Sequence, residues 1–546
     1  MNEFDRLTDP ATMPGLSFEE QTYEVSRRLA AFDRRRFLGG SAALIAASAG
    51  ISFPALAQRK GGNLRIGRSS DPDTLDPQKT TSFTSHETFT QIFDGMVMRD
   101  EKGNVLPHLA LSWEFQDDNK RVVFKLRPGV VFHDGTPCNA AAVAFTVKRH
   151  LDPATASPTK FICGPLQRAE VIDETTVAYV YSAPFVTLWV GLGGAYQAIL
   201  SPTAVEKLGA NFGRNPVGSG PFKFEKWQPD SGIKLVRNDK HMFINKRFKN
   251  DKPAHLDSIE YVVIPEDAPR LAALQSNEIQ VIAGFNAVPL DKLAQVKRMR
   301  NVKVLTRTAL SCYGIAFNTK LAPTSNLKVR QALSMAIDKN KVLQLALGGN
   351  GELAYSVLGP AFPQVLPNAK DIAPKYDPAR AKALLAEAGA ANLKLRLSSN
   401  DDSANRRACE VIQAELKAVG VEVAIEAVPG AEAAVIQRKG EHPLYMVNYR
   451  YTDGDVLHIL LHKSGSLNRG AYTDPRTDDL LDKQRLEFDP KKRDAMLNEV
   501  QKIAIEQCWW LPLYADTTAV AIRDNVEDFE NAWDARIYYK DVWLKA

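Results

Sequence analysis

The stretch from residue 106 to residue 150 restricts the possible folds more than any other part of the chain. Alternating apolar and polar residues flank the turn-forming segment 117–120, which predicts a β-hairpin. The pair Pro128-Gly129 ends the second strand. Asn139 then stands at an N-cap position before segment 140–150, whose apolar residues have helical spacing. A hairpin followed at once by a helix predicts an α/β fold.

Length and composition limit the class of protein. With 546 residues the chain is too long for a single hydrophobic core, so we expect two or three domains. The charged fraction of 24% and the hydrophobic fraction of 45% are typical of soluble globular proteins. A formal net charge of +5 is weak for this length and argues against binding to nucleic acid or to a membrane surface.

The N-terminal residues have the three parts of an export signal. The pair Arg34-Arg35 fits a twin-arginine pattern, and the mildly apolar run 39–53 is too short to stay in a membrane. Small residues ending at Ala57 form an A-x-A cleavage site. We therefore expect a leader over residues 1–57, twin-arginine export, cleavage after Ala57 and a periplasmic location. The alternative interpretation is an ordinary amphipathic N-terminal helix.

The cysteines show no paired spacing. Their number is odd, so at least one thiol stays free even in an oxidising compartment. We expect most of them to be buried and unpaired. They are Cys138, Cys163, Cys312, Cys409 and Cys508.

The order of residues across the hairpin and helix resembles a known family. Trp113, the run F-K-L-R-P-G-V-V-F-H-D-G-T-P and the following helix resemble the extracytoplasmic solute-binding proteins of the peptide-binding class, family 5 of ABC-type importers. Dipeptide, oligopeptide, nickel and glutathione binders belong there. Further similar segments are Leu75-Asp76-Pro77, residues 217–224 and residues 468–475, so the resemblance extends over nearly the whole chain after the leader.

The resemblance implies an α/β architecture of two lobes, the periplasmic-binding-protein-like class II, cluster C arrangement, with an extra subdomain in the first lobe. Two connections between lobes, expected near residues 305–312 and 508–515, would form a hinge. The expected boundaries are 58–92, 218–308 and 513–546 for lobe I, 93–217 for the extra subdomain, and 309–512 for lobe II.

Segment 446–455 is the first candidate for ligand contact. An aromatic-rich strand end runs into Asp453-Gly454-Asp455, which places carboxylates on a turn beside rings. The resemblance matches Asp453 to the aspartate that holds a ligand ammonium group. Arg450 stands where those binders commonly carry Trp, and its guanidinium favours a ligand carboxylate or phosphate. The alternative is that Asp453 and Asp455 only shape a surface turn.

Two further segments add candidates by resemblance. The loop 81–84 is expected near the cleft, with Phe83 in the core as the alternative, and the segment beginning at Asn468 is expected beside it. Arg469 is either a second anion contact or a solvated side chain. The predicted ligand-binding set is Asp453, Arg450, Tyr449, Tyr451, Asp455, Phe83, Thr84, Asn468 and Arg469.

A metal site and a cofactor are not expected. His458 and His462 are four residues apart, a spacing that can bind metal on a helix. The sequence shows no Cys or third His nearby, and the intervening residues 459–461 are typical of a core. We therefore predict no metal ligands and no catalytic residues.

The resulting hypothesis is the periplasmic substrate-binding component of an ABC importer. It would capture a peptide or peptide-like solute by closure of two lobes and deliver it to an inner-membrane ABC permease complex, acting as a monomer. The sequence contains no nucleophile–base arrangement, which argues against an enzyme. Two alternatives stay open, a secreted hydrolase and a peptide-binding chaperone that works without a transporter. A modified amino acid or opine, a glycoside and a metal chelate are also open as solutes.

Overall fold

A computed structural model of the chain describes residues 60–545 apart from 101–102, 242–244, 285, 533 and 535. The predicted leader and its cleavage site at Ala57 lie outside the described residues. In the part that the structure describes, no helix has the length and apolar character that a membrane crossing requires. All five cysteines are buried free thiols.

The first lobe is built on a mixed sheet. Strand β1 (Asn63–Arg68) pairs in parallel with β10 (Ser258–Val263) on one side and with β11 (Val281–Ile282) on the other. Strand β9 (Gly232–Arg237) continues the sheet antiparallel to β10, and β8 (Phe222–Gln228) pairs antiparallel with β9. Apolar side chains of these strands pack against helix α3 (Phe83–Ile92) in one core, and α7 (Asp267–Gln275) follows β10.

A separate antiparallel sheet forms a subdomain next to this core. Its strand order is β4 (Ala110–Gln116), β5 (Arg121–Leu126), β7 (Thr176–Tyr181) and β6 (Leu166–Asp173). Helix α4 (Ala140–Leu151) packs against it, and the Asn139 side chain accepts a hydrogen bond of 3.2 Å from the Ala142 amide. The predicted hairpin, helix and N-cap are confirmed. Short helices α5 (Leu188–Leu192) and α6 (Pro202–Leu208) lead back to the first sheet.

The second lobe has its own sheet with a core on each face. Its strand order is β16 (Glu422–Val428), β15 (Lys394–Asn400), β17 (Leu444–Arg450) and β13 (Ser311–Phe317). Side chains of β13 alternate, with Ile315 in one core and Cys312 in the other. The first core holds α9 (Leu327–Met335), α10 (Lys339–Leu347), α12 (Pro378–Glu387) and α13 (Ser403–Ala418), and the second holds α15 (Val456–Leu461), α16 (Pro475–Leu486) and α17 (Pro490–Glu506).

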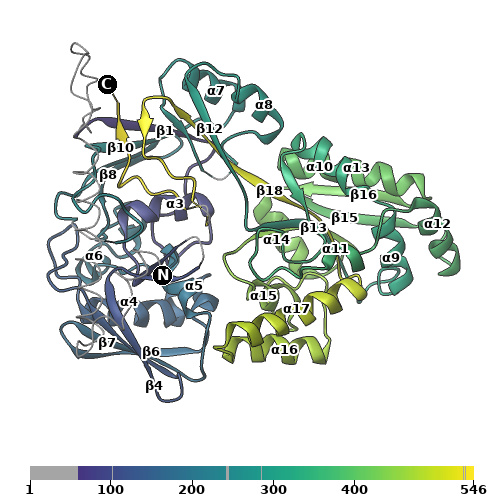
Figure 1. Cartoon of the computed structure of the whole chain (residues 1–546), viewed down its shortest axis with the longest axis horizontal. Helices are drawn as coiled ribbons and strands as arrows, with labels where there is room; N and C mark the ends of the chain where they lie inside the picture. Colours follow the sequence, from purple (N-terminus) through teal and green to yellow (C-terminus); the bar gives the residue numbers. More distant parts are fainter. Residues whose placement is uncertain are drawn as a thin grey trace, which may run out of the picture. The chain divides into compact units, whose positions relative to one another are not determined.

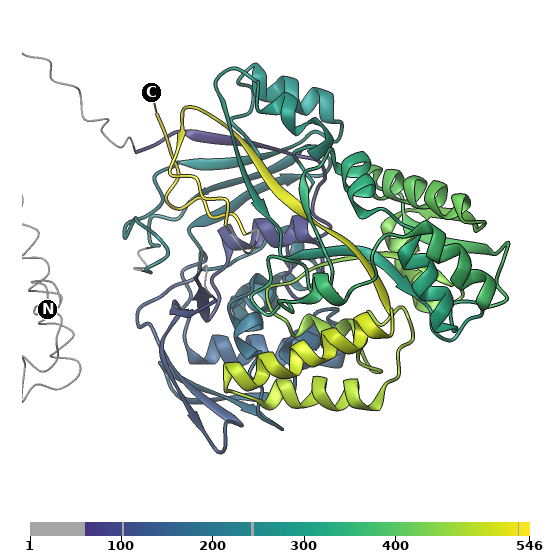
Figure 2. The ribbon, with the colours of Figure 1, turned by 45° about the vertical axis from the view of Figure 1, so that its right-hand side comes forward.

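Two neighbouring connections join the lobes. The long strand β18 (Trp510–Arg523) pairs with β13 through its first residues and with β12 (Val302–Thr308) and β11 through its last ones. Strand β12 continues directly into β13, so both connections lie side by side (Figures 1 and 2, β18 in yellow). A pair of adjacent strands is a suitable hinge because few backbone dihedrals have to absorb the motion. The domain boundaries given above stay a prediction.

A candidate ligand-binding cleft between the two lobes

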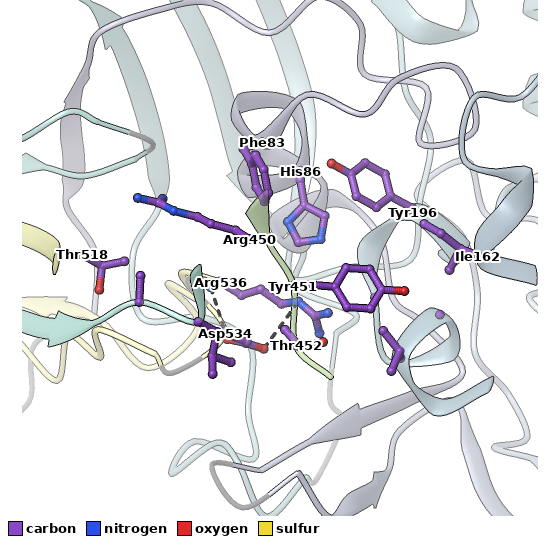
Figure 3. A pocket seen from close by; sticks show the side chains of 15 residues that line it. Phe83, His86, Ile162, Tyr196, Arg450, Tyr451, Thr452, Thr518, Asp534 and Arg536 are labelled. Carbon is purple, nitrogen blue, oxygen red and sulfur yellow. Dashed lines mark hydrogen bonds and ion pairs between the residues drawn. The ribbon is translucent and has the colours of Figure 1, made fainter. Parts of the chain in front are cut away.

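A first cavity of about 120 Å³ lies where the lobes meet. The first-lobe side chains Phe83, His86 and Tyr196 line it, and Figure 3 shows Phe83 and His86 facing the strand end that carries Arg450 and Tyr451. The C-terminal segment adds Asp534 and Arg536. Burial lowers the pKa of His86 to about 3, so its imidazole is neutral at physiological pH.

A second, larger cavity of about 550 Å³ continues from the first, because Val190, Leu310 and Thr452 line both. Its charged lining consists of Arg99, Arg307, Asp453 and Arg493. The volume is in the range of pockets for small molecules, about 300–1,000 Å³. The two cavities together form the candidate cleft.

Asp453 lies on the wall of the second cavity and is paired within the protein. Its carboxylate contacts both terminal nitrogens of Arg493, with 3.2 Å between Oδ2 and Nη1, and accepts a 2.8 Å hydrogen bond from the Asp455 amide. Burial alone would raise the pKa of Asp453, but the Arg493 guanidinium holds that pKa below its usual value. The carboxylate is therefore charged, and its four lone pairs leave room for one further donor.

Arg450 lies on the wall of the first cavity, and an acidic residue holds it from behind. Its Nη2 donates to Asp516, whose other oxygen accepts a 2.6 Å hydrogen bond from Ser311 Oγ. Burial opposes the charged form of Arg450, yet the Asp516 carboxylate raises the pKa of the guanidinium above its usual value. A fixed, charged guanidinium therefore lines the cleft.

Comparisons with known proteins show to which family the chain belongs. The model of the bacterial extracellular solute-binding proteins, family 5, matches residues 104–468. The chain belongs to this family. The two-lobe α/β fold predicted from the sequence is confirmed, and the family is one of solute-binding proteins rather than of enzymes.

Curated relatives of this family 5 protein match over most of its length. The glutathione-binding protein GsiB of Escherichia coli O6:K15:H31 is 26% identical over 498 residues, which cover 88% of this chain and 94% of GsiB. Di/tripeptide-binding protein 2 of Pseudomonas aeruginosa is 28% identical over 517 residues, with the same coverage of both chains.

Solved structures agree with the fold. The ABC transporter-associated periplasmic binding protein DppA from Helicobacter pylori, in complex with the peptide STSA, has a TM-score of 0.78 and 25% identity, covering 89% of this chain and 99% of DppA. AgaA from A. tumefaciens R10, in complex with agropinic acid, has a TM-score of 0.77 and 26% identity with the same coverage.

The other predicted residues of the 446–455 segment point in different directions. Tyr451 lines the first cavity, whereas Tyr449 lies in the core, where its hydroxyl donates to the Val357 carbonyl at 2.5 Å. Alternation along a strand would place these two side chains, which are two residues apart, on the same face. Strand β17 ends at Arg450, so Tyr451 lies beyond the strand, where it both packs against that core and reaches the cavity. Asp455 is buried and held by Arg485 and Gln484. Burial raises the pKa of Asp455, although Arg485 opposes the shift. The turn is thus buried, which excludes a surface turn.

The two remaining segments differ in their relation to the cleft. Phe83 is 38% exposed and lines the first cavity, so the core interpretation is excluded, while the Thr84 hydroxyl is bonded to that of Ser70 at 3.2 Å. Asn468 braces its own loop through the carbonyls of His462 and Tyr472, and the half-buried Arg469 donates to the Ser466 carbonyl at 3.1 Å. Among the described residues, Phe83 lines the first cavity, whereas Thr84, Asn468 and Arg469 line neither of the two cavities.

Sequence reasoning missed most of the charged residues of the cleft. They come from distant segments of the chain, and only the fold brings them together. Of the residues that the structure describes, five arginines and two aspartates line the two cavities, an excess of three positive charges, or of two when Asp516 behind Arg450 is counted. The missed residues are Arg99, Arg307, Arg493, Asp534 and Arg536, together with the uncharged His86 and Tyr196.

Proposed function

We propose that this protein is the periplasmic substrate-binding component of an ABC importer, and that it captures a peptide-like solute with more carboxylates than ammonium groups. The excess of arginine in the cleft lining carries this proposal. A positively charged, partly desolvated cleft attracts anions and penalises cationic solutes. Delivery to an inner-membrane permease completes the proposed role.

The proposed orientation of the solute follows from the two kinds of charge. Asp453 has one acceptor position left for a ligand ammonium group, as the resemblance implied. Arg450 and Arg307 are the candidates for the carboxylates, since guanidinium groups bind carboxylates in a planar, two-bonded geometry. Glutathione, di- and tripeptides and agropinic acid, the ligands named for relatives, are compatible with such a cleft.

Capture would depend on closure of the lobes. Contacts already join them: Arg99 Nη1 donates to Thr452 Oγ1 at 3.2 Å, the Val186 amide donates to the Arg485 carbonyl at 2.9 Å, and Phe115 packs edge-on against Phe488. A solute that touches both lobes adds contacts absent from the open state and so shifts the population toward the closed one.

We also propose that the chain is exported with a twin-arginine leader, that the leader is cleaved after Ala57, and that the mature protein is a monomer.

The function is tested by titration with an acidic dipeptide. Arg307 lies on strand β12 and lines the second cavity, so Arg307→Gln is expected to weaken the affinity about tenfold, or about 1.4 kcal/mol, through loss of a charge-assisted contact. Lys303→Gln, an exposed position on the same strand, is the control and should leave the affinity unchanged.

Calorimetry gives the affinities, and mass spectrometry of the recovered solute shows whether it stays intact. Equal affinity of the Arg307→Gln variant and the wild type would remove Arg307 from the site. Steady conversion of the dipeptide into products would favour the secreted hydrolase instead, and tight binding of basic but not acidic dipeptides would contradict the charge argument.

A further inference from the structure

Two pairs of possible metal ligands face each other in the second lobe. His458 lies in α15 and His462 directly after it, while Asp478 and Asp482 lie on α16. Members of each pair are four residues apart, so each pair projects from one side of its segment. These four side chains are distinct from the residues that line the two cavities.

The distances among the four side chains suit one small cation. Asp482 Oδ1 lies 3.4 Å from His458 Nε2 and 3.6 Å from His462 Nε2, and Asp478 Oδ1 lies 3.7 Å from His462 Nε2. Ligand atoms of both histidines and Asp482 all lie within 4.8 Å of one another. Tetrahedral Zn²⁺ with bonds of about 2.0–2.2 Å separates neighbouring ligand atoms by roughly 3.3–3.6 Å.

An independent observation is that the buried side chain of His462 has a ring nitrogen without a hydrogen-bond partner in the described part of the chain. Its side chain is only 6% exposed, and among the described residues Nε2 has no hydrogen-bond partner. Buried polar atoms without a partner are rare and call for an explanation. The other ring nitrogen, Nδ1, lies 2.6 Å from Ser464 Oγ and accepts a 3.1 Å hydrogen bond from the Ser464 amide. Binding of a metal to Nε2 therefore requires the ring proton to move to Nδ1, where Ser464 Oγ is the acceptor, as the second ring nitrogen of a zinc-bound histidine donates to an oxygen.

Carboxylates and positively charged side chains both lie around the histidines. The carboxylates of Asp478 and Asp482 face the histidines through their Oδ1 atoms, and Lys463 Nζ lies 3.7 Å from the other oxygen of Asp478, Oδ2. The histidine rings lie nearly parallel, 4.3 Å apart at an angle of 13°, so they have to tilt toward each other to share one ion.

We propose that His458, His462 and Asp482, with Asp478 as the fourth ligand, form a site for a divalent transition-metal cation, for which Zn²⁺ is the best fit. Imidazole and carboxylate ligands in a four-membered set favour Zn²⁺ over Ca²⁺ or Mg²⁺, which require more oxygen ligands. The ion would clamp α15 to α16. Because Gln484 and Arg485 of α16 hold Asp455, the clamp would also fix the turn that carries Asp453.

The sequence prediction of no metal ligands rested on the missing third ligand. That ligand, Asp482, is far along the chain from His458 and lies on a different helix. Only the packing of α15 against α16 brings the carboxylate beside the imidazoles.

The test is a titration of the untagged protein with Zn²⁺ in competition with a chelator. Asp482 is 63% exposed, so Asp482→Asn should fold normally, and we expect it to lower the Zn²⁺ affinity at least tenfold. Asp479→Asn is the matched control, since this neighbouring carboxylate is 56% exposed and pairs with Lys483. The wild type and the control should each bind one Zn²⁺ per chain.

Two further readouts separate the proposed site from others. Zn²⁺ should raise the thermal unfolding midpoint of the wild type and of Asp479→Asn, but not that of Asp482→Asn. The Co²⁺-loaded wild type should show the intense visible absorption of a tetrahedral site, which the double variant His458→Gln/His462→Gln should lose. Absence of Zn²⁺ binding, or equal affinity for the wild type and Asp482→Asn, would overturn the proposal without affecting the solute-binding function.

Discussion

Replacement of Arg493 by methionine is expected to lower the free energy of unfolding by about 3–5 kcal/mol, the range for removing one partner of a buried ion pair. Arg493 is 8% exposed and Asp453 7% exposed, so the variant leaves a carboxylate without its counter-charge in a desolvated position. The substitution also removes the 3.0 Å hydrogen bond from Arg493 Nε to Gln484 Oε1. Methionine keeps a similar volume, which limits the contribution of a cavity.

Urea unfolding of the solute-free protein measures this loss. Lys492→Met, at the exposed neighbouring position on α17, is the control and should stay within about 0.5 kcal/mol of the wild type. Adding Asp453→Asn to Arg493→Met should restore part of the stability, because the buried charge is then gone. A loss no larger than that of the control would show that Asp453 is not buried with Arg493 as its partner.

Replacement of Arg450 by methionine is expected to weaken binding of an acidic dipeptide by about 10- to 150-fold, equivalent to about 1.5–3 kcal/mol for a hydrogen bond to a charged group. The guanidinium lines the first cavity and balances Asp516 behind it. Without Arg450 the buried Asp516 carboxylate would also repel the carboxylate of the solute.

Titration with two ligands distinguishes a direct contact between Arg450 and the solute carboxylate from an indirect structural effect of the substitution on the site. The acidic dipeptide and its C-terminal amide are titrated into the wild type, Arg450→Met and Arg450→Lys. If Arg450 binds the terminal carboxylate, the loss in Arg450→Met is large for the acid and small for the amide, and Arg450→Lys keeps part of the affinity. Equal losses for both ligands would assign Arg450 a structural role through Asp516 alone.

Local patterns in the sequence were sufficient for the elements of the fold. The hairpin and helix of residues 110–151 and the unit of β15, α13 and β16 depend on spacing, turns and caps within short segments. The different surroundings of Tyr449 and Tyr451 could not be predicted in this way, because alternation places residues two apart on one face and Tyr451 lies beyond the end of β17.

The partners of the charged residues could not be found in this way. Asp453 was recognisable as a candidate from its turn, yet its pairing with Arg493 depends on the register of α17 against that turn. Arg99 and Arg307 have no local pattern that distinguishes them from solvated arginines, and they become cleft residues only because two lobes approach each other. Asp482 on α16 likewise has no local pattern that marks it as a ligand, and only the fold brings it close to His458 and His462.

The most direct test of solute capture between two lobes is small-angle X-ray scattering with and without a saturating acidic dipeptide. Moving the open and closed populations from 99:1 to 1:99 requires about 5.5 kcal/mol of differential binding, which a few charge-assisted contacts can supply. A smaller radius of gyration in the bound state is the predicted result. Identical scattering curves for the free protein and for the protein saturated with a tightly bound dipeptide would contradict closure of the lobes.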